Sequence, residues 1–231
     1  MTYVLHYAPD NASLIIRLAL DHLALPYTHR LVDRAAYGQR DPAYLALNPN
    51  GLIPVLETPQ GPLFETGAIL LWLADSHGGI GPSPQDSARG DFLKWLFFVS
   101  NTLHPALRLM FYPAKYIGPD PTLQEALRLG LEGQIRTALG QLDKAAASGV
   151  FAQDAPNAID FYLAGCLRWC ALYPDTRPRD WFDLADTPRL AQLCRQLEDL
   201  PCTAALQRAE GLGPTPFSAP TYATPPQGSA T

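Results

Sequence analysis

The spacing of apolar residues changes character once along the chain, and this change constrains the fold more than any other feature. Before about residue 78, short runs of β-favouring residues alternate with helical repeats, and beyond it every periodic stretch has the i, i+3, i+4 spacing of helices. The change coincides with a segment rich in Gly and Pro. We therefore predict an α/β unit at residues 1–78, a linker at 79–86 and an all-helical unit at 87–210.

The first unit has the pattern of a small mixed sheet covered by helices. Its expected order is strand, helix, strand, the two strands of a hairpin, and helix, at residues 3–7, 13–23, 27–32, 55–58, 62–64 and 66–75. Strand, helix and strand within about 30 residues fit a parallel βαβ unit. The turn Pro59-Gln60-Gly61 separates two short apolar runs, so we expect an antiparallel pair to extend the sheet.

The second unit contains four long stretches with helical spacing, at residues 89–110, 121–147, 157–172 and 188–197. Asn157 and Asp160 occupy the N-cap and N3 positions of a capping box, for which we expect a structural role. The last segment, residues 211–231, is rich in proline and has no charged residue. This composition predicts an irregular or disordered tail.

Composition excludes several classes of protein. The longest apolar run, residues 68–74, is far shorter than the roughly 20 residues that span a bilayer. A net charge of −5 argues against a nucleic-acid partner. The cysteines form no Cys-x-x-Cys pattern, so we expect buried thiols and no metal site at Cys166, Cys170, Cys194 and Cys202. No targeting segment follows Met1, and we expect a cytoplasmic protein without a membrane partner.

Two nearby segments carry the chemistry of the first unit. Pro54 begins the first hairpin strand, where its missing N–H costs no ladder bond, and a cis Ile53–Pro54 bond would present the backbone of Ile53 to a ligand. Thr66 opens the following helix, whose free amides attract an anion. Glu65 beside it offers a carboxylate to an ammonium group. The head group of an α-amino acid needs both features together.

These segments resemble the cytosolic glutathione transferases. The resemblance lies in LNPNGLIPVL at residues 47–56, in Glu65-Thr66, in a helix that ends in WLAD, and in the capping box of NAIDFYL at residues 157–163. It covers residues 3–205 and implies an α/β thioredoxin-like N-terminal domain, an all-α C-terminal domain and a homodimer.

The same resemblance assigns the glutathione site. It implies that Glu65 and Thr66 hold the γ-glutamyl end of glutathione, and that Ile53, presented by Pro54, pairs with the cysteinyl residue. Many members of the family have a basic or amide residue where this chain has Leu52. The glycyl carboxylate would then need another cation, for which Arg34 and Arg40 are the candidates.

Glutathione reacts as its thiolate, so the site must stabilise that ion. Lowering the thiol pKa by about two units requires about 2.7 kcal/mol. One hydrogen bond to a charged group supplies about 1.5–3 kcal/mol, and a helix N-terminus adds about 0.3–1 kcal/mol. A single well-placed donor near the first helix is therefore sufficient, and no metal is required.

Four residues are candidates for that donor. The segment around residues 7–14 resembles beta-class bacterial enzymes, but Ala12 stands where their cysteine would be. Ser13 and Asn11 remain, although either could equally cap the helix. Tyr7 corresponds loosely to the tyrosine of tyrosine-type members, or it is a core residue of the strand. His104 lies in a segment similar to a beta-class segment whose histidine faces glutathione.

Phe111, Tyr112 and Tyr116 follow His104 and are expected to line a pocket for an apolar electrophile, with helix packing as the alternative. The primary hypothesis is a glutathione-dependent transferase acting on a small hydrophobic electrophile, or a peroxidase acting on an organic hydroperoxide. Two alternatives stay open. One is an isomerase or dehalogenase that returns glutathione as a cofactor. The other is a binding module of the same fold that has lost turnover.

Overall fold

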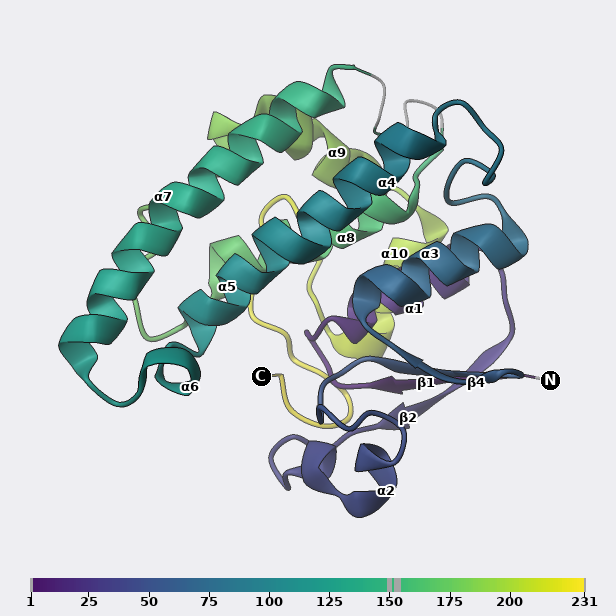
Figure 1. Ribbon diagram of the computed structural model, residues 1–231, viewed down its shortest axis with the longest axis horizontal. Coiled ribbons are helices and arrows are strands. Elements are labelled where there is room, and N and C mark those ends of the chain that lie inside the picture. The colour runs from purple at the N-terminus through teal and green to yellow at the C-terminus, as the bar shows by residue number, and fades with distance from the viewer. Residues whose placement is uncertain (1, 149–150, 152–154, 231) are drawn as a thin grey trace.

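The computed structural model describes residues 2–148, 151 and 155–230 (Figure 1). A four-stranded sheet lies at one end of the molecule. Helices α1 and α3 cover one of its faces, while the short α2 lies on the other (Figure 1). The remaining helices pack beyond α1 and α3 as a separate layer, and the two halves of the chain meet along α1.

The sheet has the strand order β2-β1-β3-β4. Its strands are β1 (Tyr3–Tyr7), β2 (Tyr27–Leu31), β3 (Val55–Thr58) and β4 (Gly61–Phe64). Strand β1 pairs in parallel with β2 and antiparallel with β3, and β3 pairs antiparallel with β4. This topology confirms the predicted βαβ unit followed by a hairpin. The Ile53–Pro54 bond just before β3 is cis.

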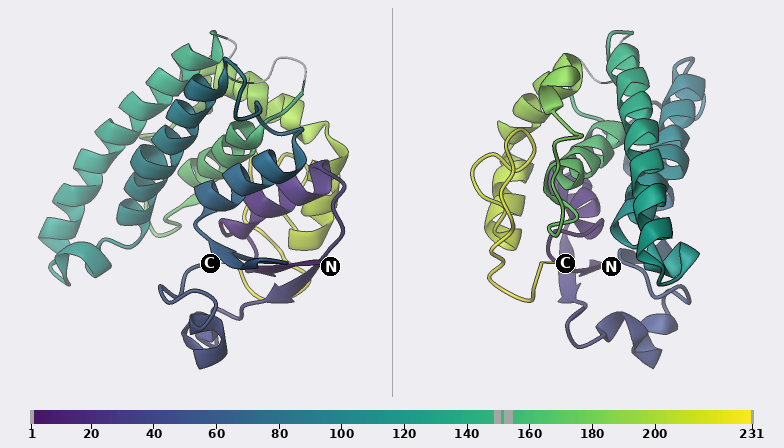
Figure 2. Two further views of the ribbon diagram at one scale, coloured as in Figure 1. Left: turned by 45° about the vertical axis from the view of Figure 1, so that its right-hand side comes forward. Right: turned by 90° about the vertical axis from the view of Figure 1, so that its left-hand side faces the viewer.

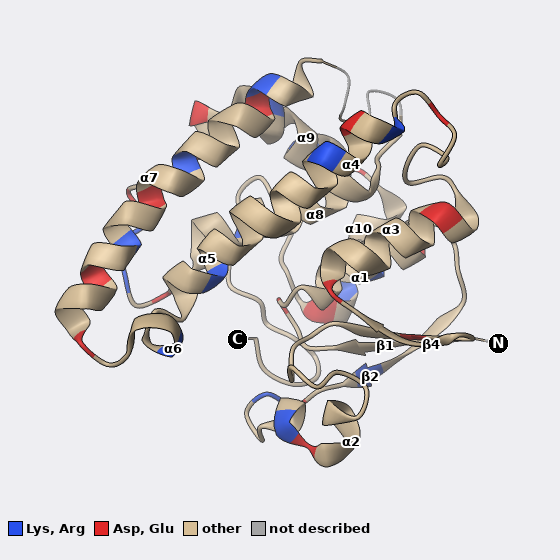
Figure 3. Ribbon diagram, viewed as in Figure 1, with Lys and Arg blue, Asp and Glu red and all other residues tan. Residues whose placement is uncertain are grey.

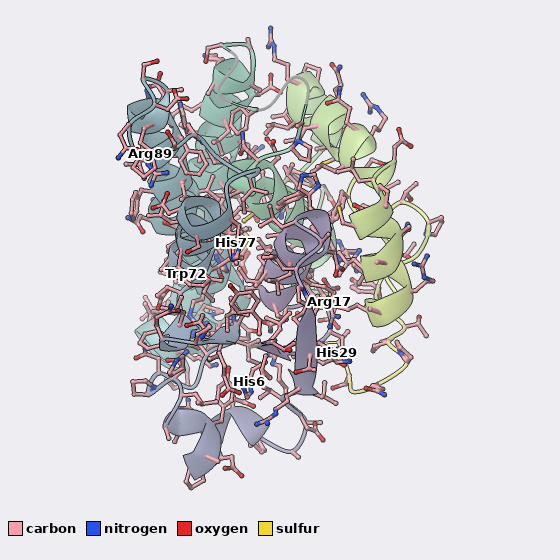
Figure 4. All side chains as sticks on the ribbon, turned by 90° about the vertical axis from the view of Figure 1, so that its right-hand side faces the viewer. His6, Arg17, His29, Trp72, His77 and Arg89 are labelled. Atoms are coloured by element: carbon pink, nitrogen blue, oxygen red, sulfur yellow. The ribbon has the colours of Figure 1, made fainter. Side chains whose placement is uncertain are left out.

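The three helices of this half are α1 (Ser13–His22), α2 (Pro42–Leu45) and α3 (Thr66–His77). Arg17 interrupts the apolar sequence of α1 and, as a charged residue, would ordinarily face solvent. Arg17 is instead buried, because α10 covers this side of α1 and Glu210 accepts a hydrogen bond from Arg17 Nε at 3.0 Å. His6 lies on the opposite face of the sheet, toward α2, where its ring is 5.8 Å from that of Tyr44 (Figure 4).

The regular secondary structure of the second half is all helical in the described residues. Its α-helices are α4 (Arg89–Phe98), α5 (His104–Phe111), α6 (Ala114–Ile117), α7 (Pro121–Ala146), α8 (Ala158–Leu172), α9 (Pro188–Glu198) and α10 (Pro201–Glu210). No helix in the described part of the chain is long and apolar enough to cross a bilayer.

The predicted helix over 89–110 contains a π-helical turn, Val99–Leu103, between α4 and α5. Pro105 has no N–H to offer the carbonyl of Asn101, so the regular i to i−4 ladder cannot continue there. At the start of α8 the predicted capping box is confirmed, since Asn157 Oδ1 accepts from the backbone N–H of Ile159 and Asp160 Oδ2 accepts from that of Asn157. Helices α6 and α10 were not individually predicted.

The main apolar core runs through both halves of the chain, and a second, small cluster of Val32, Tyr44 and Val55 lies apart from it. Helix α1 packs against α3 on one side and against α8 and α10 on the other. At Gly165 of α8, an added Cβ would lie 2.9 Å from Cγ1 of Ile15, so the close approach of α8 to α1 depends on the missing side chain. All four cysteines are free and buried, as predicted.

The C-terminal segment is irregular, as predicted, but the expectation of disorder is wrong. It runs from α10 back past α8 toward the sheet (yellow in Figures 1 and 2). Phe217 is only 1% exposed, and the carboxylate of Glu198 accepts hydrogen bonds from the backbone N–H groups of Phe217 and Ser218 at 2.8 and 2.7 Å. Arg168 of α8 donates to the carbonyls of Pro216 and Thr221. Buried side chains and paired backbone groups therefore hold the tail in place.

Candidate active site

A cavity of about 730 Å³ lies between the two halves of the chain. Its lining comes from the β1–α1 loop, the turn before β3, the first residues of α3, one face of α4 and α5, and the end of α8 with the loop that follows. These segments are far apart in the sequence, and the packing of α1 against α3 and α8 brings them together. Most of the predicted site residues lie in this cavity.

The start of α3 contributes both a carboxylate and a set of free amides. The first helical hydrogen bond is donated by Ile69 N–H to the Glu65 carbonyl at 3.0 Å. The amides of Thr66, Gly67 and Ala68 are therefore without an intrahelical acceptor, and all three residues line the cavity. Glu65 has φ 71°, a conformation uncommon for residues other than glycine, and it also lines the cavity. The carboxylate and the free amides that an α-amino acid head group needs therefore line the same cavity.

The turn before β3 presents Ile53 and Pro54 to the same cavity. Ladder pairing of β3 begins at Val55, so the backbone of Ile53 lies outside the sheet. The turn is held by Tyr44 Oη and Asn48 Nδ2, which donate to the Leu52 carbonyl at 2.7 and 2.8 Å. No local sequence pattern indicates the roles of these two supporting side chains.

Asn11 lies at the start of α1 and lines the cavity together with Ala12. Its Oδ1 accepts from the backbone N–H of Ala12 at 2.8 Å. The side-chain oxygen of Asn11 is therefore occupied by a backbone hydrogen bond, and its Nδ2 group remains as a donor. The residue at the N-cap position of α1 is Ala12, which makes no side-chain cap.

Two of the predicted thiol donors, Ser13 and Tyr7, lie outside the cavity. Ser13 is fully buried, and its hydroxyl donates to the Ala8 carbonyl at 3.0 Å and accepts from the Ala8 N–H at 3.3 Å. Tyr7 is 3% exposed and packs in the core, with the Arg17 guanidinium 4.7 Å from its ring centre. Neither hydroxyl is placed to meet a thiol in the cavity, so we do not retain them as donors.

His104, at the start of α5, lines the cavity and is neutral near pH 7. Burial, together with a smaller effect of the positive charge of Arg108, lowers its pKa to about 4. Its Nδ1 lies 2.9 Å from Tyr162 Oη, and burial raises the pKa of Tyr162, so that this phenol keeps its proton. If Tyr162 donates to Nδ1, the imidazole carries its own proton on Nε2. A neutral imidazole held in this way is a hydrogen-bond donor.

The aromatic residues predicted for the electrophile pocket separate into two groups. Phe111 and Tyr112 line the cavity, whereas Tyr116 is 45% exposed and lies outside it, where its hydroxyl accepts from Arg108 Nε at 2.7 Å. Arg34 also lines the cavity and donates to Tyr112 Oη at 3.1 Å. Of the two cations considered for the glycyl carboxylate, Arg34 is therefore the one that reaches the site.

Asp10 has a structural role that its position in the sequence does not indicate. It is buried with φ 52°, and its carboxylate accepts from Arg168 Nε at 2.7 Å, from Arg168 Nη2 at 2.8 Å and from Tyr173 Oη at 2.7 Å. Its backbone N–H donates to Glu210 at 3.0 Å. Asp10 thus fixes the loop that carries Asn11, and Arg168 neutralises its charge. A lone arginine inside the apolar sequence of α8 was the available signal.

Comparison with known proteins adds three findings to this geometry. A family model described as "Glutathione S-transferase, N-terminal domain" matches residues 12–76. The chain is 31% identical over 212 residues to glutathione S-transferase GST-4.5 of Xanthomonas campestris, which covers 90% of this chain and 98% of the relative.

Solved structures show the same fold. A sphingomonad glutathione S-transferase complexed with glutathione matches with a TM-score of 0.74 at 27% identity, over 91% of this chain and 100% of the other. The glutathione-S-transferase from Xylella fastidiosa matches with a TM-score of 0.77 at 24% identity, again over 91% and 100% of the two chains.

Proposed function

Because the chain belongs to the glutathione S-transferase family and is a glutathione transferase, we propose that it binds glutathione in this cavity and directs the thiolate at an electrophile near Phe111 and Tyr112. The observation that carries the proposal is the convergence in one cavity of Glu65, the free amides at the start of α3 and the backbone of Ile53. The glutathione bound to the sphingomonad relative supports it.

Each part of glutathione has a chemically matched group in the cavity. The carboxylate of the γ-glutamyl group accepts hydrogen bonds from the amides of Thr66 and Gly67. The ammonium of the same group pairs with the Glu65 carboxylate. The cysteinyl amide pairs with the backbone of Ile53. The glycyl carboxylate takes Arg34, which lies in the same cavity. This arrangement leaves the thiol on the side of the β1–α1 loop.

Two donors are proposed for the thiolate, Asn11 Nδ2 and His104 Nε2. Both residues line the cavity, one from each half of the chain. Two neutral hydrogen bonds of about 1 kcal/mol each, with about 0.3–1 kcal/mol from the N-terminus of α1, lower a thiol pKa by roughly two units. The bound thiol is then mostly ionised at pH 7.

The reaction is a substitution or an addition at carbon. In a substitution on an aryl halide, the thiol first loses its proton to solvent, the sulfur–carbon bond forms, and halide leaves with the bonding electron pair. Peroxidase turnover and isomerisation with returned glutathione require the same thiolate. Hydroperoxide reduction, followed with cumene hydroperoxide, tests the first of these alternatives. A homodimer and a cytoplasmic location stay predictions.

The test is an ultraviolet titration of the thiolate of glutathione bound to the purified protein. We expect a pKa near 6–7 in the wild type, and a pKa raised by roughly one unit in Asn11→Ala or in His104→Ala when the replaced residue meets the sulfur. Glu65→Gln should weaken glutathione binding by about tenfold or more. Its matched control, Glu132→Gln on α7, should leave binding unchanged. A bound thiol that titrates at its free value would overturn the activation scheme.

A further inference from the structure

Cations gather around the phenol ring of Tyr112 at one end of the cavity. Arg34 donates to its hydroxyl at 3.1 Å, Lys115 Nζ lies 4.4 Å from the ring centre, and the Arg108 guanidinium lies 5.8 Å from it. The charge of Arg40 acts on Lys115 as well. These residues come from α5, α6 and the segment that leads to α2, and Figure 3 shows blue segments on all three.

This cluster has no acidic partner within the protein. The ion pairs formed among residues 2–148, 151 and 155–230 use other cations, and none joins a carboxylate to Arg34, Arg40, Arg108 or Lys115. Nη1 of Arg34 is buried without a hydrogen-bond partner. Burial lowers the pKa of Lys115 most, and repulsion by the neighbouring arginines lowers it further.

Glutathione alone does not neutralise the cluster. In the proposed binding mode the glycyl carboxylate of glutathione pairs with Arg34, and the other two charged groups of glutathione lie at the start of α3. Arg108 remains without a counter-charge. It stands one helical turn after His104 on α5, a rise of about 6 Å, and it lines the same cavity. Asp175, in the loop after α8, also lines the cavity but forms no ion pair with these cations among the described residues.

We propose that the electrophile carries a carboxylate, which binds Arg108 with support from Lys115, while its apolar part packs on Phe111 and Tyr112. This inference rests on the proposed function and specifies its substrate class. An acid group held one helical turn from His104 would place the reactive carbon of a single-ring compound near the thiolate. The buried Nη1 of Arg34 and the lack of an ion pair to these cations among the described residues are then the features of a site completed by its ligands.

A matched pair of electrophiles tests the proposal: 4-chloro-3-nitrobenzoate, which carries the carboxylate, and 1-chloro-2,4-dinitrobenzene, which does not. For Arg108→Met we expect kcat/KM for the acid to fall about tenfold to a hundredfold more than kcat/KM for the neutral compound, because only the acid loses a charge-assisted hydrogen bond. The KM for glutathione should stay unchanged. Arg108→Lys should retain part of the preference, and the exposed Arg136→Met of α7 should have no effect.

Equal losses for both compounds, or a raised KM for glutathione, would overturn the proposal because Arg108 would then serve glutathione or the fold. Failure of the proposed function has a different signature, namely no turnover of either compound. In that case calorimetric binding of 3-nitrobenzoate and nitrobenzene decides. Preferential binding of the acid that is lost in Arg108→Met would support the anion site. Equal binding of the two compounds would reject it.

Discussion

Arg168 and Arg108 both lie near the cavity, but they differ in whether a protein carboxylate pairs with them. Arg168 is fully buried and directs its donors to the Asp10 carboxylate and to two carbonyls of the tail. Arg108 donates only to the hydroxyl of Tyr116 in the hydrogen bonds of the described residues and has no carboxylate partner there. One charge is satisfied inside the fold, and the other is left for a ligand.

The difference shows how an arginine near the cavity can serve structure or binding. A buried ion pair adds little net stability, but removing one partner strands the other charge, so such a pair fixes geometry. The Asp10–Arg168 pair joins the β1–α1 loop to α8 and to the tail. An unpaired cation has the opposite character, because its removal costs the fold little and its neutralisation favours a bound anion.

The largest effect is expected from breaking the pair. Arg168→Met should lower the free energy of unfolding by about 3–5 kcal/mol, since it leaves the Asp10 carboxylate buried and uncompensated. Arg108→Met is the matched variant and should change stability by no more than about 0.5 kcal/mol. Urea unfolding at pH 7 measures both. Similar losses in the two variants would show that the two arginines have the same role and would remove the contrast.

The anchoring of the tail should give the next largest effect. Phe217→Ala removes a ring that is 1% exposed and should cost about 3 kcal/mol. The tail also supplies the two carbonyls that Arg168 uses, so part of the loss reaches the Asp10–Arg168 pair. Gln227→Ala, at an exposed position of the same tail, is the control. If Phe217→Ala unfolds at the wild-type urea concentration, the tail is dispensable, as its composition had first indicated.

The sequence was informative where the signal is local. The order of strands and helices in the first half follows from apolar periodicity and from the turn at residues 59–61. Glu65, Thr66 and Ile53 could be identified as candidates because a helix start and a strand start are each encoded within a few residues, and the family resemblance supplied their roles toward glutathione. These positions line the cavity as expected.

Long-range pairing was beyond the reach of the same reasoning. Asp10 and Arg168 are 158 residues apart, and no local pattern states that the two side chains meet. The cluster around Tyr112 likewise combines α5 and α6 with the segment before α2. Ser13 illustrates a related limit, because a hydroxyl near a helix start can face a cavity or bond to its own backbone. Here the Ser13 hydroxyl donates a hydrogen bond to the Ala8 carbonyl.

The smallest expected effect is a change in the pKa of His104 when the unpaired charge of Arg108 is removed. The charge of Arg108 lowers the pKa of His104 in addition to the larger effect of burial. Arg108→Met should therefore raise that pKa above about 4, while burial keeps it below the ordinary value of 6.5. Arg108→Lys should leave it nearly unchanged. The NMR signal of the His104 ring, assigned with His104→Asn and followed between pH 7 and 4, reports the shift.

The same titration has a consequence for stability, and its sign follows from the lowered pKa. Because the folded protein disfavours the proton on His104, its contribution to stability is complete above about pH 6.5 and is lost as the pH falls toward about 4. In Arg108→Met this loss should be smaller, since the folded and unfolded pKa values lie closer together. An unchanged pKa in that variant would mean that the charge of Arg108 is already neutralised at His104, and the distinction between the paired and the unpaired arginine would fail there.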